Sequence, residues 1–160
     1  HLFNIPCTGL RFFTVYGPYG RPDMAYYSFT KAIFEGSSID VFNMGIMQRD
    51  FTYIDDIVEG IVRLIELIPL SQAHDGTNSI APFRVLNIGN NKPVSLRRFI
   101  GAIERSVGKK AIENLLPMQA GDVPITYADI DPLFKLCGFK PNTSIEEGID
   151  KFVKWYKGKG

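Results

Sequence analysis

The chain has 160 residues, of which 45% are hydrophobic and 22% charged, and this composition predicts one domain with a buried core. The formal net charge of +1 gives no electrostatic reason to expect binding to nucleic acid or to an anionic membrane surface. No apolar run approaches the roughly 18 residues that a membrane-spanning helix needs.

The first residues, 1–6, have neither an initiator methionine nor a helix cap and run directly into an apolar segment. We therefore expect the chain to be a fragment of a longer protein. Residues 8–15 are β-rich and largely apolar, which predicts a strand buried on both faces of a parallel sheet. After a turn-rich loop, Asp23 is the expected N-cap of a helix over residues 24–35, which Gly36 closes.

The next segment predicts two short strands and a helix. Residues 39–42 are the first expected strand, and the loop after it leads to Arg49. Residues 51–54 predict the second strand, and apolar residues at helical spacing predict a helix from 56 to 69. These apolar residues are Ile57, Val58, Ile61, Leu64, Ile65 and Ile68. The polar segment 71–82 predicts an exposed loop.

Strands and helices also alternate in the second half. Thr143 or Ser144, followed by acidic residues, is a capping-box signature for the start of the last helix. The expected elements are a buried strand over 83–88, a helix over 95–107 capped by Ser95, a strand over 112–118, a short helix over 131–138 and a last helix over 145–156. Connected strand and helix units of this kind predict the α/β fold class.

Cys7 and Cys137 lie far apart and show neither metal nor redox spacing. We expect both to be small buried hydrophobic residues of a protein in the reducing cytoplasm.

Arg49 is the most informative candidate binding residue. It lies just before an expected strand and helix, and ligands of open α/β folds gather at such element ends. A guanidinium offers several fixed donors and stays charged, so a phosphate is the ligand we expect there. The structural alternative is an ion pair with Asp50 or Asp55. The cluster of Asp50, Asp55 and Asp56 suggests helix capping rather than a metal site.

Four separated motifs together resemble a known family. They are residues 10–18 (LRFFTVYGP), 20–25 (GRPDMA), 49–56 (RDFTYIDD) and 118–123 (MQAGDV). On these motifs the chain resembles the C-terminal half of an extended short-chain dehydrogenase/reductase. The family is that of the NAD-dependent sugar-nucleotide epimerases and dehydratases, and the chain is most similar to UDP-glucuronate 4-epimerases.

The resemblance implies a fold and a function for the intact protein. The fold is the C-terminal part of an extended Rossmann-type, doubly wound fold, in which residues 1–160 form the UDP-sugar-binding part. The implied reaction interconverts UDP-glucuronate and UDP-galacturonate through a transient 4-keto sugar, with NAD held mainly by an absent N-terminal half. The alternatives are a UDP-sugar decarboxylase or dehydratase of the same family, or a non-catalytic UDP-binding scaffold. The sequence leaves the oligomeric state undecided, with a homodimer as one possibility.

The resemblance also implies roles for individual residues. Phe12 and Phe13 would pass beside the nicotinamide, and Thr14 would contact the sugar or its phosphates. Arg21 is a candidate partner for the sugar carboxylate or the pyrophosphate, with pairing to Asp23 as its structural alternative. The other expected substrate-binding residues are Met24 and Ala25 near the nucleotide, Phe42 against the uracil, Arg49 at the pyrophosphate and Asp122 near the ribose. The structural alternative for Phe42 is a position in the hydrophobic core without contact to the uracil.

The chain departs from the family pattern in two ways. Many relatives carry a second arginine where this chain has Gln119, so Arg21 is expected to take over part of the anion binding. The glycine-rich dinucleotide loop and the catalytic Tyr-x-x-x-Lys pair have no match, so no catalytic residue is assigned and the chain alone is expected to be inactive. Tyr27 and Lys31 have the right spacing, but we interpret them as structural because they follow the strand that should come after the catalytic helix.

Overall fold

The computed structural model describes residues 2–70 and 81–158, which form an α/β fold, as predicted. The elements in chain order are β1 (Cys7–Phe12), β2 (Thr14–Tyr16), α1 (Ala25–Glu35), β3 (Ser38–Val41), the 3-10 helix η1 (Phe42–Gly45), β4 (Gln48–Arg49), β5 (Phe51–Tyr53), α2 (Ile54–Ile65), β6 (Phe83–Ile88), β7 (Val94–Ser95), α3 (Leu96–Val107), β8 (Ile112–Leu115), α4 (Asp131–Cys137) and α5 (Ile145–Lys157). No described helix is both long and apolar enough to cross a membrane.

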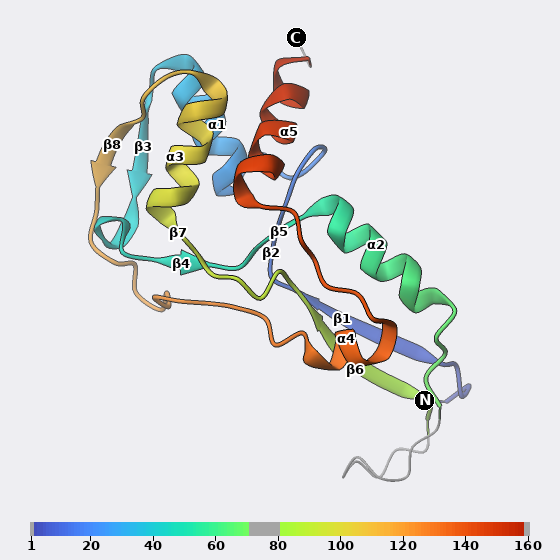
Figure 1. Cartoon of the computed structure of the whole chain (residues 1–160). Helices are drawn as coiled ribbons and strands as arrows, with labels where there is room; N and C mark the ends of the chain where they lie inside the picture. The colour runs from blue at the N-terminus through green and yellow to red at the C-terminus, as the bar shows by residue number, and fades with distance from the viewer. Residues whose placement is uncertain (1, 71–80, 159–160) are drawn as a thin grey trace.

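In the described parts of the chain, the strands pair two by two. The pairs β1–β6, β2–β5 and β3–β8 are parallel, whereas β4 and β7 are antiparallel. Figure 1 shows β1 and β6 at one end of the molecule with α2 and α4, and β3 and β8 at the other end with α1 and α3. The short strands β4 and β5 run between these two ends, so residues 48–53 lie where the chain's separate segments meet.

Two clusters of buried side chains form the core. The larger cluster joins α1, α3 and α5 to the short strands and is rich in aromatic residues. In it Phe51 stacks on Phe99 with ring centroids 4.5 Å apart, and Tyr26 meets Phe152 edge-on at 4.9 Å. Such stacked and edge-on aromatic pairs add about 0.5–1.5 kcal/mol each beyond the burial of their area. The smaller cluster packs α2 and α4 against β6 through Ile57, Leu64, Leu86, Ile88 and Leu133.

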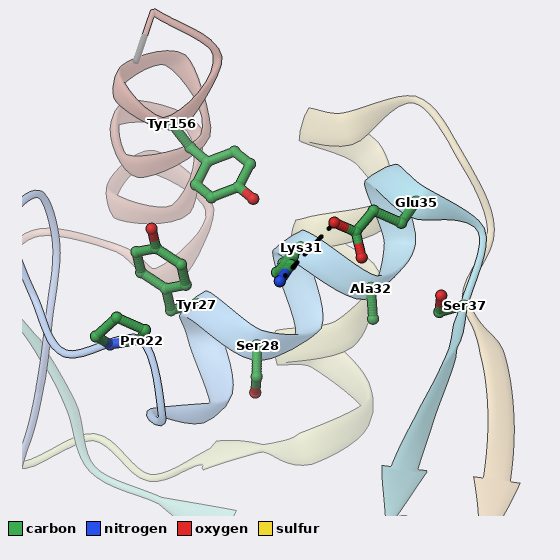
Figure 2. A pocket seen from close by; sticks show the side chains of 8 residues that line it. All are labelled: Pro22, Tyr27, Ser28, Lys31, Ala32, Glu35, Ser37 and Tyr156. Carbon is green, nitrogen blue, oxygen red and sulfur yellow. Dashed lines mark ion pairs between the residues drawn. The ribbon is translucent and has the colours of Figure 1, made fainter. Parts of the chain in front are cut away.

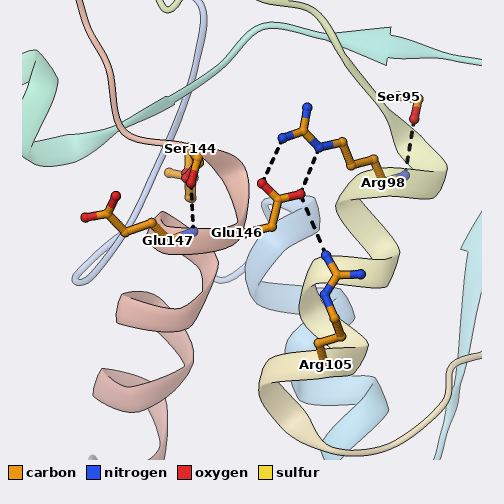
Figure 3. A network of polar contacts seen from close by, with 7 residues as sticks. Ser95, Arg98, Arg105, Ser144, Glu146 and Glu147 are labelled. Atoms are coloured by element: carbon orange, nitrogen blue, oxygen red, sulfur yellow. Dashed lines mark hydrogen bonds and ion pairs between the residues drawn. The ribbon is translucent and has the colours of Figure 1, made fainter.

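Helix α5 is fixed to α3 by the polar network in Figure 3. The Ser144 hydroxyl accepts the Glu147 N–H at 3.2 Å, which confirms the predicted cap. Glu146 takes two 2.8 Å hydrogen bonds from Arg98 and lies 3.7 Å from Arg105, both on α3. The bonds from Arg98 hold the pKa of Glu146 below its usual value. Because the pair is exposed, its contribution is about 1 kcal/mol or less.

The prediction of one long strand over residues 8–15, buried on both faces, is wrong. The strand breaks at Phe13 into β1 and β2, which pair with different partners. Most of β1 is exposed, including Cys7 and Phe12. A strand is buried on both faces only when neighbouring strands and two covering layers surround it, and among the described residues β1 pairs with β6 alone. The Cys7 prediction fails for the same reason, while Cys137 is half-buried.

Several predicted boundaries also shift. Helix α1 begins at Ala25 with Met24 as its N-cap, because the Asp23 carboxylate binds Arg21 instead of capping the helix. Gly36 closes the helix in the left-handed conformation at φ 74°, as predicted. Helix α2 runs from Ile54 to Ile65, so it ends four residues before the predicted end. The predicted loop over 71–82 lies outside the described residues except for its last two, which are buried.

Candidate functional site

A cleft of about 240 Å³ lies where the short strands meet α1, α3 and the segment after β8. Its lining residues are Thr14, Ala25, Phe29, Asp40, Phe42, Met47, Arg49, Phe51, Val94, Leu96 and Asp122. They come from segments spread over more than a hundred residues of sequence, so the cleft is a product of the tertiary fold.

Five of the residues that the sequence singled out lie together in this cleft. They are Thr14 at the start of β2, Ala25 at the start of α1, Phe42 in η1, Arg49 in β4 and Asp122 in the loop after β8. Phe42 is half-buried beside the cleft, not sealed in the core. The structure therefore brings a cation, a carboxylate, a hydroxyl and a half-buried aromatic ring to one place.

The charged pair of the cleft is Arg49 and Asp122. The Arg49 Nη2 atom lies 2.6 Å from Asp122 Oδ1, and the two side chains are 22% and 32% exposed. Arg49 Nη1 also donates to the carbonyl of Gln48 at 2.9 Å, so the guanidinium is held from two sides. The expected alternative, an ion pair of Arg49 with Asp50 or Asp55, is wrong, because Asp122 is its partner.

Backbone pairing explains why these two residues meet. Gln48 and Arg49 pair antiparallel with Ser95 and Val94 of β7. On its other side Gln48 bridges the segment after Asp122: its N–H donates to the Pro124 carbonyl at 2.9 Å and its carbonyl accepts the Thr126 N–H at 3.3 Å. The segment that carries Asp122 is thus fixed beside β4.

The sequence did not single out the apolar wall of the cleft. Phe29, Met47, Phe51, Val94 and Leu96 line it. Their spacing is that of core positions in helices and strands, and several of them do contact the core, so no local pattern separates wall from core. Asp40 is a further lining residue that was missed. It accepts a hydrogen bond from the Asn114 side chain at 2.8 Å.

Four predicted binding residues are not among the residues that line the cleft. Arg21 is 75% exposed and binds Asp23 through two hydrogen bonds of 2.7 and 3.1 Å. Met24 packs against the larger core cluster. Phe12 and Phe13 lie at the carboxyl end of β1 and just after it, with Phe12 52% exposed. Their roles stay predictions.

Tyr27 and Lys31 belong to a separate depression of about 600 Å³, which Figure 2 shows between α1 and α5. The Tyr27 ring meets Tyr156 edge-on at 5.4 Å, and Lys31 lies 3.9 Å from Glu35. No residue lines both this depression and the cleft. The interpretation of this pair as structural stays a prediction.

The aspartates near Arg49 bind backbone groups. Asp50 is fully buried and accepts the N–H groups of Asn90, Asn91 and Ala128. Asp56 accepts the Thr143 N–H at 3.0 Å. In the described ranges, no group of three or more His, Cys, Asp or Glu side chains is arranged to hold a metal ion.

Comparison with known proteins places these residues in a family context. Residues 1–81 match the profile of the NAD dependent epimerase/dehydratase family. Protein CapI of Staphylococcus aureus is 55% identical over 98% of this chain and 48% of its own length. A probable UDP-glucuronate 4-epimerase of Rhizobium meliloti is 52% identical, again over 98% of this chain and 48% of its own length.

A solved structure shows the same fold. The UDP-glucuronic acid 4-epimerase of Bacillus cereus, in complex with UDP-glucuronic acid and NAD, superposes with a TM-score of 0.82 at 35% identity. The match covers 99% of this chain and 47% of that one. The chain thus spans about half the length of the relatives it matches, and the prediction of part of a Rossmann-type fold is confirmed.

Proposed function

This chain belongs to the NAD dependent epimerase/dehydratase family, and we propose that it is the UDP-sugar-binding part of a longer enzyme that interconverts UDP-glucuronate and UDP-galacturonate. The reaction would proceed by epimerisation at C4 through a transient 4-keto sugar. The observation that carries the proposal is the cleft in which Thr14, Phe42, Arg49 and Asp122 meet. The solved relative bound to UDP-glucuronic acid and NAD gives the ligand class.

Three polar groups of the cleft, those of Arg49, Asp122 and Thr14, match parts of a UDP-sugar. The Arg49 guanidinium suits a diphosphate, because a guanidinium offers a fork of donors and a positive charge to phosphate oxygens. Asp122 offers a carboxylate that accepts hydrogen bonds from ribose hydroxyls, and Thr14 offers a hydroxyl to the phosphates or the sugar. The Phe42 ring would lie against the uracil. Together they hold the nucleotide and leave the hexose free to turn over between oxidation and reduction.

The residues of this chain fit only a small part of NAD. Phe12 and Phe13 present apolar rings at and just beyond the carboxyl end of β1, which suit the nicotinamide and not a phosphate. When bound, NAD supplies the acceptor and donor of the hydride at C4. We assign the remaining NAD contacts and the catalytic tyrosine and lysine to the N-terminal half of the intact enzyme.

Positioning is therefore the contribution that we assign to this half. A clamp on the diphosphate and ribose places C4 for reaction, and positioning of this kind supplies several kcal/mol to catalysis. The sugar carboxylate also has to be held steady, because a 4-keto sugar acid loses CO₂ readily.

Product analysis tests the proposal. The intact protein, incubated with UDP-glucuronate and NAD, should form UDP-galacturonate without release of CO₂, whereas the 160-residue chain alone should form no product. Release of CO₂ with a pentose product would identify a decarboxylase. UDP binding without turnover by the intact protein would favour the non-catalytic scaffold. Conversion by the chain alone would overturn its assignment as a binding part.

A further inference from the structure

A carboxylate next to Arg49 has an unusual environment. Asp50 is 0% exposed, and no ion pair of this residue occurs within the described residues. Its oxygens instead accept three backbone N–H groups: Asn90 at 2.8 Å, Asn91 at 3.0 Å and Ala128 at 2.8 Å. The Thr52 hydroxyl lies 3.5 Å from the same carboxylate. A buried charge is stable only when hydrogen bonds replace its water, and these N–H groups do so.

Each segment that Asp50 touches also carries a residue of the cleft. Asn90 and Asn91 precede Val94 in the same connection, and Ala128 follows Asp122 in the segment after β8. The Asp50 carbonyl accepts the N–H of Thr14 at 3.1 Å, and Arg49 is its chain neighbour. One buried residue therefore links the chain segments of four cleft-lining residues.

The glycine before Asn90 shows how tightly this junction is packed. A Cβ atom on Gly89 would lie 2.9 Å from Asp50 Oδ2 and 2.6 Å from the Ala128 Cβ. Only a residue without a side chain lets the connection approach the carboxylate so closely. The junction can therefore be disturbed from two independent positions, Asp50 and Gly89.

We propose that Asp50 is a positioning residue of the cleft, whose carboxylate fixes the β6–β7 connection and the segment after β8 so that Asp122 holds the Arg49 guanidinium in one geometry toward the diphosphate. This inference rests on the proposed function and deepens it. Asp50 does not line the cleft, so it acts on the ligand through Arg49, its chain neighbour, whose guanidinium is held by Asp122. An asparagine at this position would replace one accepting carboxylate oxygen with an NH₂ group, which is a donor like the backbone N–H groups that it would face. The chain segment of residue 50, the β6–β7 connection and the segment after β8 would then separate.

The test compares Asp50→Asn with Asp56→Asn in the intact protein. Asp56 is the control, because its carboxylate is also buried and accepts a backbone N–H, that of Thr143, but it does not line the cleft. Its link to the junction is indirect, through the Thr143 carbonyl, which accepts a hydrogen bond from the Asn90 side chain at 3.3 Å. Calorimetry with UDP and with uridine should show that Asp50→Asn weakens UDP binding by about tenfold, or about 1.4 kcal/mol, and uridine binding much less. Asp56→Asn should change neither affinity by more than about twofold, even where urea denaturation shows a similar loss of stability.

A double-mutant cycle shows whether the effect passes through Arg49. If it does, adding Asp50→Asn to Arg49→Ala should weaken UDP binding little beyond Arg49→Ala alone. Gly89→Ala should reproduce the selective loss of UDP affinity, and it replaces Asp50→Asn if that variant does not fold. Equal UDP affinities of the Asp50→Asn and Asp56→Asn variants, or additive losses with Arg49→Ala, would overturn the inference. If Arg49→Ala itself left UDP binding unchanged, the proposed function would fail first.

Discussion

Arg49 Nη2 and Asp122 Oδ1 lie 2.6 Å apart, although the two residues are separated by 73 positions in the chain. The same Asp122 oxygen accepts its neighbour's N–H, that of Val123, at 2.8 Å. The cation assigned to the diphosphate and the carboxylate assigned to the ribose thus contact each other directly. The pair is pre-organised, and a nucleotide that enters the cleft has to take over part of Arg49's interaction with Asp122.

Replacement of Arg49 by alanine should weaken UDP binding to the intact protein by about 1.5–3 kcal/mol, the range for hydrogen bonds to a charged group. The loss should be larger for UDP than for uridine, because only UDP carries the diphosphate. Isothermal titration calorimetry with both ligands measures the difference. Arg63→Ala is the control, since that arginine pairs with Glu59 on the exposed face of α2 and does not line the cleft. An unchanged UDP affinity in Arg49→Ala would remove the clamp from the proposed function.

Asp122→Asn should separate the two roles assigned to this carboxylate. Inorganic pyrophosphate should bind more tightly, by about 0.5–1 kcal/mol, because Arg49 loses a competing partner worth about as much as a partly exposed ion pair. Uridine should bind more weakly, because the ribose loses a charged acceptor. Competition titrations with both ligands test the opposite signs. If the affinities for pyrophosphate and uridine changed in the same direction, Asp122 would not both compete for Arg49 and bind the ribose.

Phe42→Ala should weaken the binding of uridine and UDP by similar amounts, about 1–3 kcal/mol, the usual value for stacking of a base on an aromatic ring. Pyrophosphate affinity should stay unchanged, because the ring would contact the base and not the phosphates. Phe134→Ala is a suitable control for the loss of a partly exposed aromatic ring, since Phe134 lies on α4 and outside the cleft. Equal uridine affinity with and without the Phe42 ring would show that this ring does not contact the base.

The sequence predicted several of the features that depend on neighbouring residues, although not the N-cap of α1, where Asp23 binds Arg21 instead. Ser144 caps α5 and Gly36 ends α1, because each side chain or conformation acts within one helical turn. It failed where the outcome depends on distant segments. The exposure of β1 is set by how many strands and layers surround it, and the role of Asp50 is set by N–H groups 40 or more positions away.

The same distinction explains which residues of the candidate site could be predicted from the sequence. Arg49 and Asp122 carried a signal because they lie in motifs shared with a family. The apolar wall of Phe29, Val94 and Leu96 carried none, since apolar residues at helix and strand spacing indicate burial and not which of them borders a cleft. The Arg49–Asp122 pair itself was not predicted either. It depends on the bridge between Gln48 and the segment after β8, which no local pattern reveals.

Stability at high pH should depend on Tyr16, which is 1% exposed and whose hydroxyl lies 3.3 Å from the carbonyl of Ser144. Burial, and then the negative charge of Asp56, raise the pKa of Tyr16 above its ordinary value of 10.0. The unfolded chain therefore loses this proton at a lower pH than the folded protein does. Below about pH 10 the ionisation of Tyr16 therefore adds no pH dependence to the free energy of unfolding. Above about pH 10 it lowers the free energy of unfolding by up to about 1.4 kcal/mol per pH unit.

Urea denaturation of the intact protein between pH 8 and 11 measures this fall. Tyr16→Phe cannot ionise and should show a shallower decline, and the remaining decline includes Tyr26, Tyr53 and Tyr156, whose pKa values burial also raises. Tyr19→Phe is the control, because the Tyr19 side chain is 87% exposed, with its ring edge-on to Trp155 at 5.1 Å. The outcome against this prediction is an equal loss of stability per pH unit above pH 10 in Tyr16→Phe and the unaltered protein. Ionisation of Tyr16 would then not be linked to folding, and the Tyr16 hydroxyl would not be buried against the start of α5.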